Sequence, residues 1–480
     1  MSMRLHLRLA SCLVASMLCL NVGAQTNLVV SEPSTKQTPS PQPQVQKLTL
    51  SAAIDAAEAN YPRVRAALEQ RNSAQAAIGV ARSAYYPHAD LLWQTNRATA
   101  NNIYGLLLPQ GVVPSISGPV IASDNTRSAW SSAGGTLISW QAFDFGFRAA
   151  QVNAAKQGAE AANAGFALTK LDVAVLAANT YFDLAAAEQL ATTAQANVDR
   201  LQVFAQAVHV LVDNQLRPGA DAAQADAELA LARTQLIQAQ TSVEVRRVTL
   251  DELVGAPTVE VDYNKLLAPA PSEQPSPASI ASHPAAQREA ALVNQQEARL
   301  SALAHSYVPH FNALGALSGR GAGTDPSGTF PGGTNGLAPS TMNWAAGVQI
   351  MFPAFDFFRV RSEKKVQAAN VRAEQASYAQ LVDDLSAGLQ QAQALLSGAR
   401  QAALNTPVEL AAAQQSEVQQ RARFQAGLAT VVDVAAAESV LVQAEADDAV
   451  ARLNVWRAMA GVAAARGDLT PFLSQLAGQP

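Results

Sequence analysis

Residues 142–145 read Ala-Phe-Asp-Phe, and residues 354–357 repeat the same four residues about 212 positions later. Asp221 and Asp433 keep this offset. Upstream, a second set of landmarks matches at an offset of about 222; it pairs Pro62, Pro87 and His88 with Pro284, Pro309 and His310. One loop has therefore changed length by about ten residues between two copies of one unit. The shared offsets predict an internal duplication.

Each copy has the same predicted order of elements. A helical stretch, 49–84 or 286–306, ends at a Tyr-Tyr-Pro or Tyr-Val-Pro sequence, where proline pushes the chain into extended backbone. Two β-segments follow, near 88–98 and 129–141 in the first copy and near 310–319 and 342–352 in the second. Two helical arms with few breakers complete each copy; they cover 147–214 with 221–254, and 358–424 with 431–465.

The arms are much longer than helices of a globular domain. A run of about 65 helical residues spans roughly 100 Å. Tyr378, Leu381, Leu385 and Leu389 recur at the spacing of a coiled-coil seam, and abundant alanine allows close packing between arms. Pro407 lies within the third arm and is expected to kink it. The pattern predicts long helical hairpins rather than a compact core.

The β-segments carry aromatic residues at their ends. Trp130 and Trp140 share one strand face, as do Trp344 and Phe352, which is typical of the lipid-facing aromatic girdles of outer-membrane strands. An ordinary soluble sheet is the alternative. Four strands cannot close a barrel, and a bilayer tolerates no open strand edge, so the membrane interpretation requires oligomers. Three chains would supply about twelve strands.

The ends of the chain and its middle predict segments outside the repeats. Arg4, Arg8 and the apolar run 9–20 have the form of a secretory signal, with cleavage after Ala24. The predicted segments are a signal peptide at 1–24, a flexible Pro-rich segment at 25–47, the first repeat at 48–255, a Pro-rich linker at 256–285, the second repeat at 286–467 and a tail at 468–480.

Composition excludes several classes of function. The net charge is -5 and no basic run occurs, so we expect no nucleic-acid partner. Both cysteines, Cys12 and Cys19, lie in the signal, and the histidines show no ligand spacing. We therefore predict no catalytic residue, no cofactor and no metal site, and we expect that the protein is not an enzyme.

Four features carry a resemblance to a known family: the duplicated order of elements, the Tyr-x-Pro before each β-pair, the repeated Ala-Phe-Asp-Phe, and the sequence Phe-Gln-Ala-Gly-Leu-Ala-Thr-Val-Val-Asp at 424–433. In these features the chain resembles the TolC-like outer membrane efflux proteins. The resemblance implies a mainly α protein with a β-barrel portion. Long α-helical hairpins would form a periplasmic α-barrel, and four β-strands per chain would contribute to a trimeric twelve-stranded outer-membrane β-barrel.

The resemblance implies that the protein would be an efflux duct in the outer membrane of a Gram-negative bacterium, extending into the periplasm. Its expected partners are two further copies of itself, outer-membrane lipid, a periplasmic adaptor and an inner-membrane pump. Type I protein secretion and a periplasmic coiled-coil scaffold remain alternatives.

The resemblance also implies a closable periplasmic entrance at the hairpin turns. Asp221 and Asp433 match the acidic positions of that entrance, although a carboxylate at a helix start also stabilises the helix locally. Phe424 and Gly427 belong to the second turn, and Arg217 of the first is a candidate basic partner.

The chain departs from the family pattern around these positions. Phe424 replaces a tyrosine, Ala429 a basic residue and Ala436 a second aspartate, so a polar latch through those positions is not expected. Gln215 stands where the second turn has Gly427, and we expect Pro218-Gly219 to make the first turn.

Overall fold

A computed structural model describes residues 46–99, 128–256, 259–268, 279–323, 329, 332–353 and 355–477. The predicted signal peptide, most of the predicted flexible segment 25–47 and the last three residues lie outside the described part. So do the loop 100–127 and part of the Pro-rich linker. Cleavage after Ala24 stays a prediction.

The first half of the chain begins with two helices rather than one. Thr49 caps α2 by accepting a hydrogen bond from the Ala52 N–H, and Pro62 ends this helix and starts the next, because proline fits the first turn of a helix but not its interior. The predicted single stretch 49–84 is wrong at this point. The half contains α2 (Leu50–Asn60), α3 (Pro62–Ser83), β2 (His88–Thr99), β3 (Ser128–Phe143), α4 (Phe147–Asp213) and α5 (Gly219–Val254).

The second half repeats this order from α6 onward. It contains α6 (Pro284–Ala304), β5 (His310–Ala322), β6 (Thr341–Met351), α7 (Phe357–Gln425) and α8 (Val431–Arg466). Helix α7 remains one helix across Pro407. The neighbouring Thr406 hydroxyl lies 3.1 Å from Asp448 Oδ1, which ties α7 to α8 beside the proline.

The four long strands form one antiparallel sheet in the order β2-β3-β5-β6. The predicted four strands are therefore confirmed. Strands from the two halves meet at the centre, where Thr136 of β3 pairs with Leu317 of β5. Strands β2 and β6 form the two edges of this sheet.

The two faces of the sheet differ in polarity. The pairing register places all the tryptophans and most of the large aliphatic residues of the four strands on one face, because side chains alternate along a strand. That face, called here the apolar face, includes Leu91, Trp93, Ile138, Trp140, Leu317, Met342, Trp344, Val348 and Ile350. The opposite face carries Asp90, Gln94, Ser139, Gln141, Asn312, Ser318, Arg320, Asn343 and Gln349.

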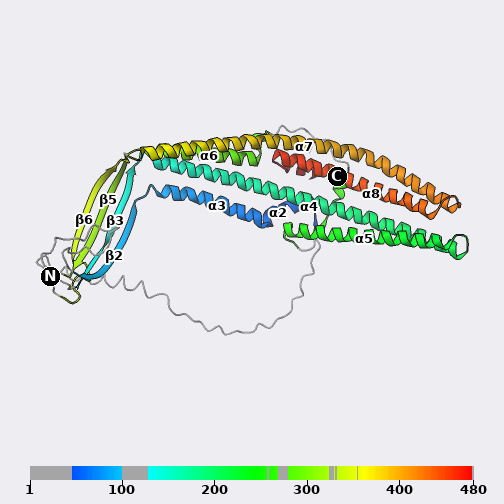
Figure 1. Cartoon of the computed structure of the whole chain (residues 1–480), viewed down its shortest axis with the longest axis horizontal. Helices are drawn as coiled ribbons and strands as arrows, with labels where there is room; N and C mark the ends of the chain where they lie inside the picture. The colour runs from blue at the N-terminus through cyan, green and yellow to red at the C-terminus, as the bar shows by residue number, and fades with distance from the viewer. Residues whose placement is uncertain are drawn as a thin grey trace. The chain divides into compact units, whose positions relative to one another are not determined.

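The long helices pack in pairs, α4 with α5 and α7 with α8, as Figure 1 shows; α4 also contacts α3, α6 and α8. The main core lies where α2, α4, α8 and the short elements meet, around the fully buried Tyr181, Phe182 and Trp456. Part of α4 is apolar enough to span a membrane by length and composition alone. The same helix supplies Tyr181 and Phe182 to this core. We therefore interpret α4 as a helix of the packed hairpins and not as a membrane-spanning helix.

Short elements occur where the sequence predicted only linkers and tails. Strand β1 (Gln46–Leu48) pairs in parallel with β4 (Val259–Val261), so Gln46 and Lys47 do not belong to a flexible segment. The Tyr181 hydroxyl lies 3.0 Å from Leu48 O and 2.8 Å from Asp262 O, which fixes this pair to α4. Also unforeseen are η1 (Asn264–Leu267), η2 (Ile280–Ser282) and α9 (Thr470–Ala477).

Candidate functional site

The turns between α4 and α5 and between α7 and α8 have the same backbone. Gln215 has φ +58° and Gly427 has φ +74°, and both stand one residue past the helix cap. In the first turn the Leu216 N–H donates to Leu211 O at 2.9 Å, and in the second the Leu428 N–H donates to Arg423 O at 2.8 Å. Both turns are thus Schellman-type helix ends.

This geometry corrects the prediction for the first turn. Pro218-Gly219 does not make the reversal, because Pro218 is the N-cap of α5 with φ -66° and Gly219 is the first residue of that helix. Gln215 adopts the left-handed conformation itself, although a side chain makes that conformation less favourable than it is for glycine.

Asp433 forms a capping box with Thr430 at the start of α8. The Thr430 N–H donates to Asp433 Oδ2 at 2.8 Å, and the Asp433 N–H donates to Thr430 Oγ1 at 3.3 Å. The pKa of Asp433 is lowered below its ordinary value by two hydrogen bonds from Thr430. The bond from the backbone N–H has the larger effect, and the bond from the hydroxyl group has the smaller one. Asp433 remains exposed and negatively charged.

Asp221 has a different partner from its repeat equivalent. Pro218 has neither an N–H nor a hydroxyl, so Asp221 cannot form the capping box that Asp433 forms. Its Oδ2 instead lies 3.6 Å from Arg217 Nη1, and both side chains are largely covered. The two aspartates are matched in sequence but not in environment.

Arg217 connects the two turns. Its Nη2 donates to Phe424 O at 3.0 Å and to Ala429 O at 3.3 Å, both in the second turn. Its guanidinium group also lies over the Phe424 ring, 4.4 Å from the centroid. One side chain of the first hairpin therefore satisfies two carbonyl groups at the end of the second.

Phe424 is buried where the ends of the helices pack together next to the turns. It is 4% exposed, and its ring meets Phe204 of α4 edge-on with centroids 5.2 Å apart. A separate hydrophobic cluster surrounds this pair and joins both hairpins; it includes Val198, Leu201, Val208, Ala225, Leu229, Val431 and Val434. The replacement of a tyrosine by Phe424 thus fits an apolar contact at this position.

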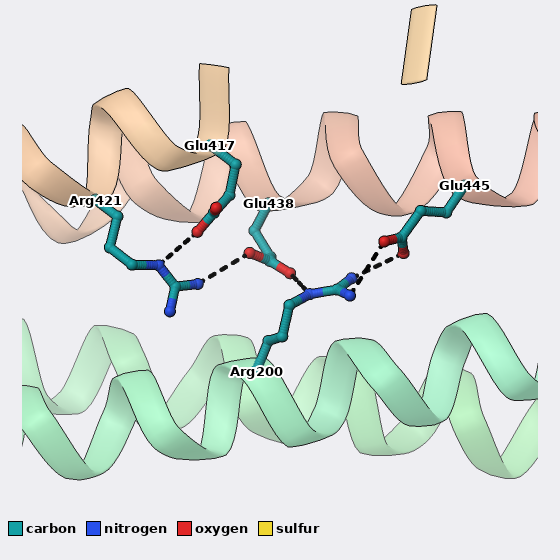
Figure 2. Close-up of polar contacts among 5 residues, drawn as sticks. All are labelled: Arg200, Glu417, Arg421, Glu438 and Glu445. Atoms are coloured by element: carbon teal, nitrogen blue, oxygen red, sulfur yellow. Dashed lines mark hydrogen bonds and ion pairs between the residues drawn. The ribbon is translucent and has the colours of Figure 1, made fainter. Parts of the chain in front are cut away.

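An ion-pair network that the sequence did not predict lies further along the same helices (Figure 2). Arg200 of α4 donates from Nε to Glu438 Oε1 of α8, and its Nη2 lies 2.9 Å from Glu445 Oε2. Arg421 of α7 reaches the second oxygen of Glu438 at 3.4 Å and also pairs with Glu417. Glu438 is only 2% exposed, so this network is central to the contact between the hairpins.

Part of this network has a counterpart in the first hairpin. His209 Nε2 lies 2.9 Å from Asp226 Oδ1, and these residues match Arg421 and Glu438 at the offset of about 212. From the sequence, His209 showed no metal-ligand spacing, and this contact was not predicted. The hydrogen bond to Asp226 raises the pKa of the exposed His209 ring above its ordinary value.

The predicted aromatic girdle residues lie on or beside the apolar face. Trp344 is 80% exposed, while Trp130 is partly covered by Arg97, whose guanidinium group lies 5.4 Å from the ring centroid. Trp140 donates from Nε1 to Tyr85 O at 2.9 Å, at the helix end of the sheet. Phe352 follows the last residue of β6 and packs against Tyr307, with ring centroids 5.3 Å apart.

Within the described ranges, no group of three or more His, Cys, Asp or Glu side chains is arranged to hold a metal ion.

Solved structures similar to this chain are outer-membrane proteins. The Campylobacter jejuni CmeC outer membrane channel is 16% identical with a TM-score of 0.70, covering 90% of this chain and 89% of that one. The Vibrio cholerae outer membrane protein VceC is 17% identical with a TM-score of 0.70, covering 87% and 96%. The open-state Neisseria gonorrhoeae MtrE outer membrane channel is 20% identical with a TM-score of 0.67, covering 87% and 89%.

A search of curated protein sequences found no match. The sequence model for outer membrane efflux proteins, in contrast, matches residues 53–256 and 277–468, which together form most of the chain. The chain therefore belongs to the outer membrane efflux protein family, and it is the outer-membrane channel component of an efflux pump.

Proposed function

We propose that three copies of this chain close one duct, with their sheets joined edge to edge into a twelve-stranded barrel. The observation that carries this proposal is the sheet order β2-β3-β5-β6, antiparallel throughout, with β2 and β6 at the edges. Because four alternating strands leave β2 and β6 opposite in direction, the β6 edge of one copy can pair antiparallel with the β2 edge of the next. The result is an even number of strands, as in bacterial single-chain barrels.

The polarity of the sheet supports an orientation. The apolar face would contact lipid, and Trp130, Trp140, Trp344 and Phe352 would lie at its borders as girdle residues. The opposite face, with its Asn, Gln and Ser side chains, would line an aqueous lumen. Closure removes the exposed strand edges, which lipid does not tolerate.

The hairpin turns would form the periplasmic entrance. Asp433 would carry its negative charge there, because its lowered pKa keeps it ionised and its side chain is exposed. Three copies in a ring would concentrate this charge and favour cations. Asp221 would contribute less, since Arg217 lies beside it. Arg217, Phe424 and Gly427 would hold the turns in place.

Membership of the outer membrane efflux protein family supports the partners expected from the sequence. The duct would be passive, with an inner-membrane pump supplying the energy and a periplasmic adaptor joining the pump to the hairpin ends.

The test is reconstitution of the purified, signal-cleaved protein. We expect a trimer by native mass spectrometry and discrete conductance steps in planar lipid bilayers. A monomer that fractionates with soluble periplasmic protein and gives no conductance would contradict the proposal.

A further inference from the structure

A recess of about 550 Å³ lies on one side of the layer formed by α3, α4 and α6. Both outer helices pack against α4, which Figure 1 shows between them. The volume of the recess falls within the roughly 300–1,000 Å³ of most small-molecule sites. Residues from all three helices form its walls, and they include Arg63, Gln70, Gly158, Gly165, Arg288 and Gln295.

The recess lies on the side of α4 that faces away from the main core. Asp172 lines the recess, and Tyr181 of the core follows nine residues later, which is two and a half helical turns. The two side chains therefore point to opposite sides of α4. The short elements β1, β4 and α9 lie on the Tyr181 side, because Leu48, Val261 and Phe472 belong to that core. In the proposed duct these elements would block the lumen if they lay inside it, so the recess is on the lumen side.

Arg288 brings to the recess a positive charge that has no ion-pair partner. Within the described residues it forms no hydrogen bond and no ion pair. Its charge acts on Glu289, the next residue of α6, but Glu289 also has a carboxylate neighbour in Glu374 of α7. The other arginine of the recess, Arg63, pairs with Asp172 at 3.4 Å. The charged side chains that line the recess therefore sum to one positive charge.

Two glutamine side chains add neutral donors beside this charge. Neither Gln70 nor Gln295 forms a hydrogen bond within the described part of the chain, so both amide groups are available to a ligand. Gly158 allows Gln295 to lie against α4, since a Cβ atom at position 158 would collide with Gln295 Nε2. The stem of Arg288 lies over Gly165, with its Cδ atom 3.7 Å from the position that a Cβ would take. The glycines thus leave the floor of the recess open.

The remaining walls are apolar and include Ala161, Leu168 and Leu292. A guanidinium group binds a carboxylate through two parallel N–H donors, and the neighbouring amide groups can donate to the same oxygens. The apolar walls suit an aromatic or aliphatic body attached to that carboxylate. An inorganic anion would leave these walls without a contact, so a small organic anion matches the recess better.

We propose that the recess binds small amphipathic carboxylates on their way through the duct, with Arg288 contacting the carboxylate and Leu168 and Leu292 contacting the apolar body. This inference rests on the proposed function, because the recess faces a lumen only when three copies close the duct. Each duct carries three such recesses between the sheet and the periplasmic entrance. An occupied recess narrows the lumen at that height.

The experiment measures binding of 2-naphthoate to the signal-cleaved protein in lipid nanodiscs by isothermal titration calorimetry. The matched ligand is 2-naphthamide, a neutral molecule of nearly the same shape. We expect one 2-naphthoate site per chain and binding of the amide that is about tenfold weaker, because the amide lacks the charge that Arg288 contacts. Inorganic phosphate at the same concentration should not displace 2-naphthoate.

Three variants test the residues of the recess. Arg288→Gln should weaken 2-naphthoate binding about tenfold, and Gly165→Leu should abolish it by filling the recess without a change of charge. Arg299→Gln, which changes an exposed arginine on α6 outside the recess, should leave the binding unchanged. In planar bilayers, 2-naphthoate added from the barrel side should lower the single-channel conductance, and Gly165→Leu should remove this effect.

Four results of the titrations would overturn the inference: no saturable binding, equal binding of 2-naphthamide, displacement by inorganic phosphate, or equal losses in Arg288→Gln and Arg299→Gln. Binding that leaves the conductance unchanged would also overturn it, because the recess would then lie outside the lumen. Trimer mass and conductance without ligand are measured in parallel. If both are normal, these results reject the recess alone. If the unmodified protein neither trimerises nor conducts, the proposed function fails, and the inference that rests on it fails as well.

Discussion

The guanidinium group of Arg217 stacks on the ring of Phe424, 4.4 Å from its centroid, and so joins the turn of one hairpin to the turn of the other. Arg217 comes from the first copy of the internal repeat and Phe424 from the second. The equivalent of Arg217 in the second copy is Ala429, so the contact has no counterpart. The two hairpin ends are therefore held together asymmetrically.

Arg217→Ala should loosen the hairpin ends. The substitution removes the stacking and two hydrogen bonds to carbonyl groups, and a bond from a charged donor contributes about 1.5–3 kcal/mol. We expect faster hydrogen exchange in both turns and a higher mean single-channel conductance. Arg233→Ala is the matched control, because Arg233 lies on the same hairpin and, among the described residues, hydrogen-bonds to Gln202 of that hairpin. Equal effects of both substitutions would contradict the role of Arg217.

Asp433→Asn should reduce cation preference more than Asp221→Asn does. Both substitutions keep the size of the side chain and remove its charge. Asp433 is exposed and charged, whereas the charge of Asp221 is already opposed by Arg217. Reversal potentials across a salt gradient in planar bilayers measure the preference. If Asp221→Asn has the larger effect, the entrance charge has been assigned to the wrong residue.

The capping box also gives a pH dependence with a definite sign. The folded-state pKa of Asp433 is lowered, so the stability from its ionised form is present above the unfolded pKa and is lost as pH falls through the folded pKa. Cation preference should therefore persist as pH falls from about 7 to about 4. Thr430→Val, which removes one donor to the carboxylate, should shift the loss of preference to higher pH.

The sequence predicted the elements whose signals are local and long. The breaker-free run 147–214 became α4, and the alternating positions between Trp130 and Trp140 became one face of β3. Strands β1 and β4 were missed because three residues are too short to show a period. The first turn was misassigned because Gln215, unlike glycine, gives no sequence signal for a positive φ.

Contacts between distant residues left weaker signals. The spacing of Glu417 and Arg421 predicts a pair on one helix face, since residues four apart are neighbours on a helix. Nothing local connects Arg200 to Glu438, which lies in the other half of the chain. Only 15% of the residues are charged. The presence of charged residues within the coiled-coil helices was therefore the one sequence feature that suggested an ion pair between the hairpins.

Arg200→Met should open the contact between α4 and α8. Breaking a buried ion pair costs about 3–5 kcal/mol when one charge is left behind, and the lower end applies because Arg200 is partly exposed. Hydrogen exchange should accelerate in both helices around these residues. The double variant Arg200→Met with Glu438→Leu should recover part of the protection, because it removes the buried Glu438 carboxylate, which the single variant leaves with the longer 3.4 Å contact to Arg421. If the double variant exchanges faster than the single variant, this electrostatic explanation is wrong.

Ile138→Asp should impair assembly of the trimer in the outer membrane. Ile138 lies on the apolar face between Trp130 and Trp140, and a carboxylate there would have to be buried in lipid. Ser139→Asp is the matched control, because the next residue along β3 faces the opposite, polar side of the sheet. Trimer levels on unheated gels of membrane fractions measure the outcome. Normal trimer with Ile138→Asp, or equal loss with Ser139→Asp, would reject the proposal that this face contacts lipid.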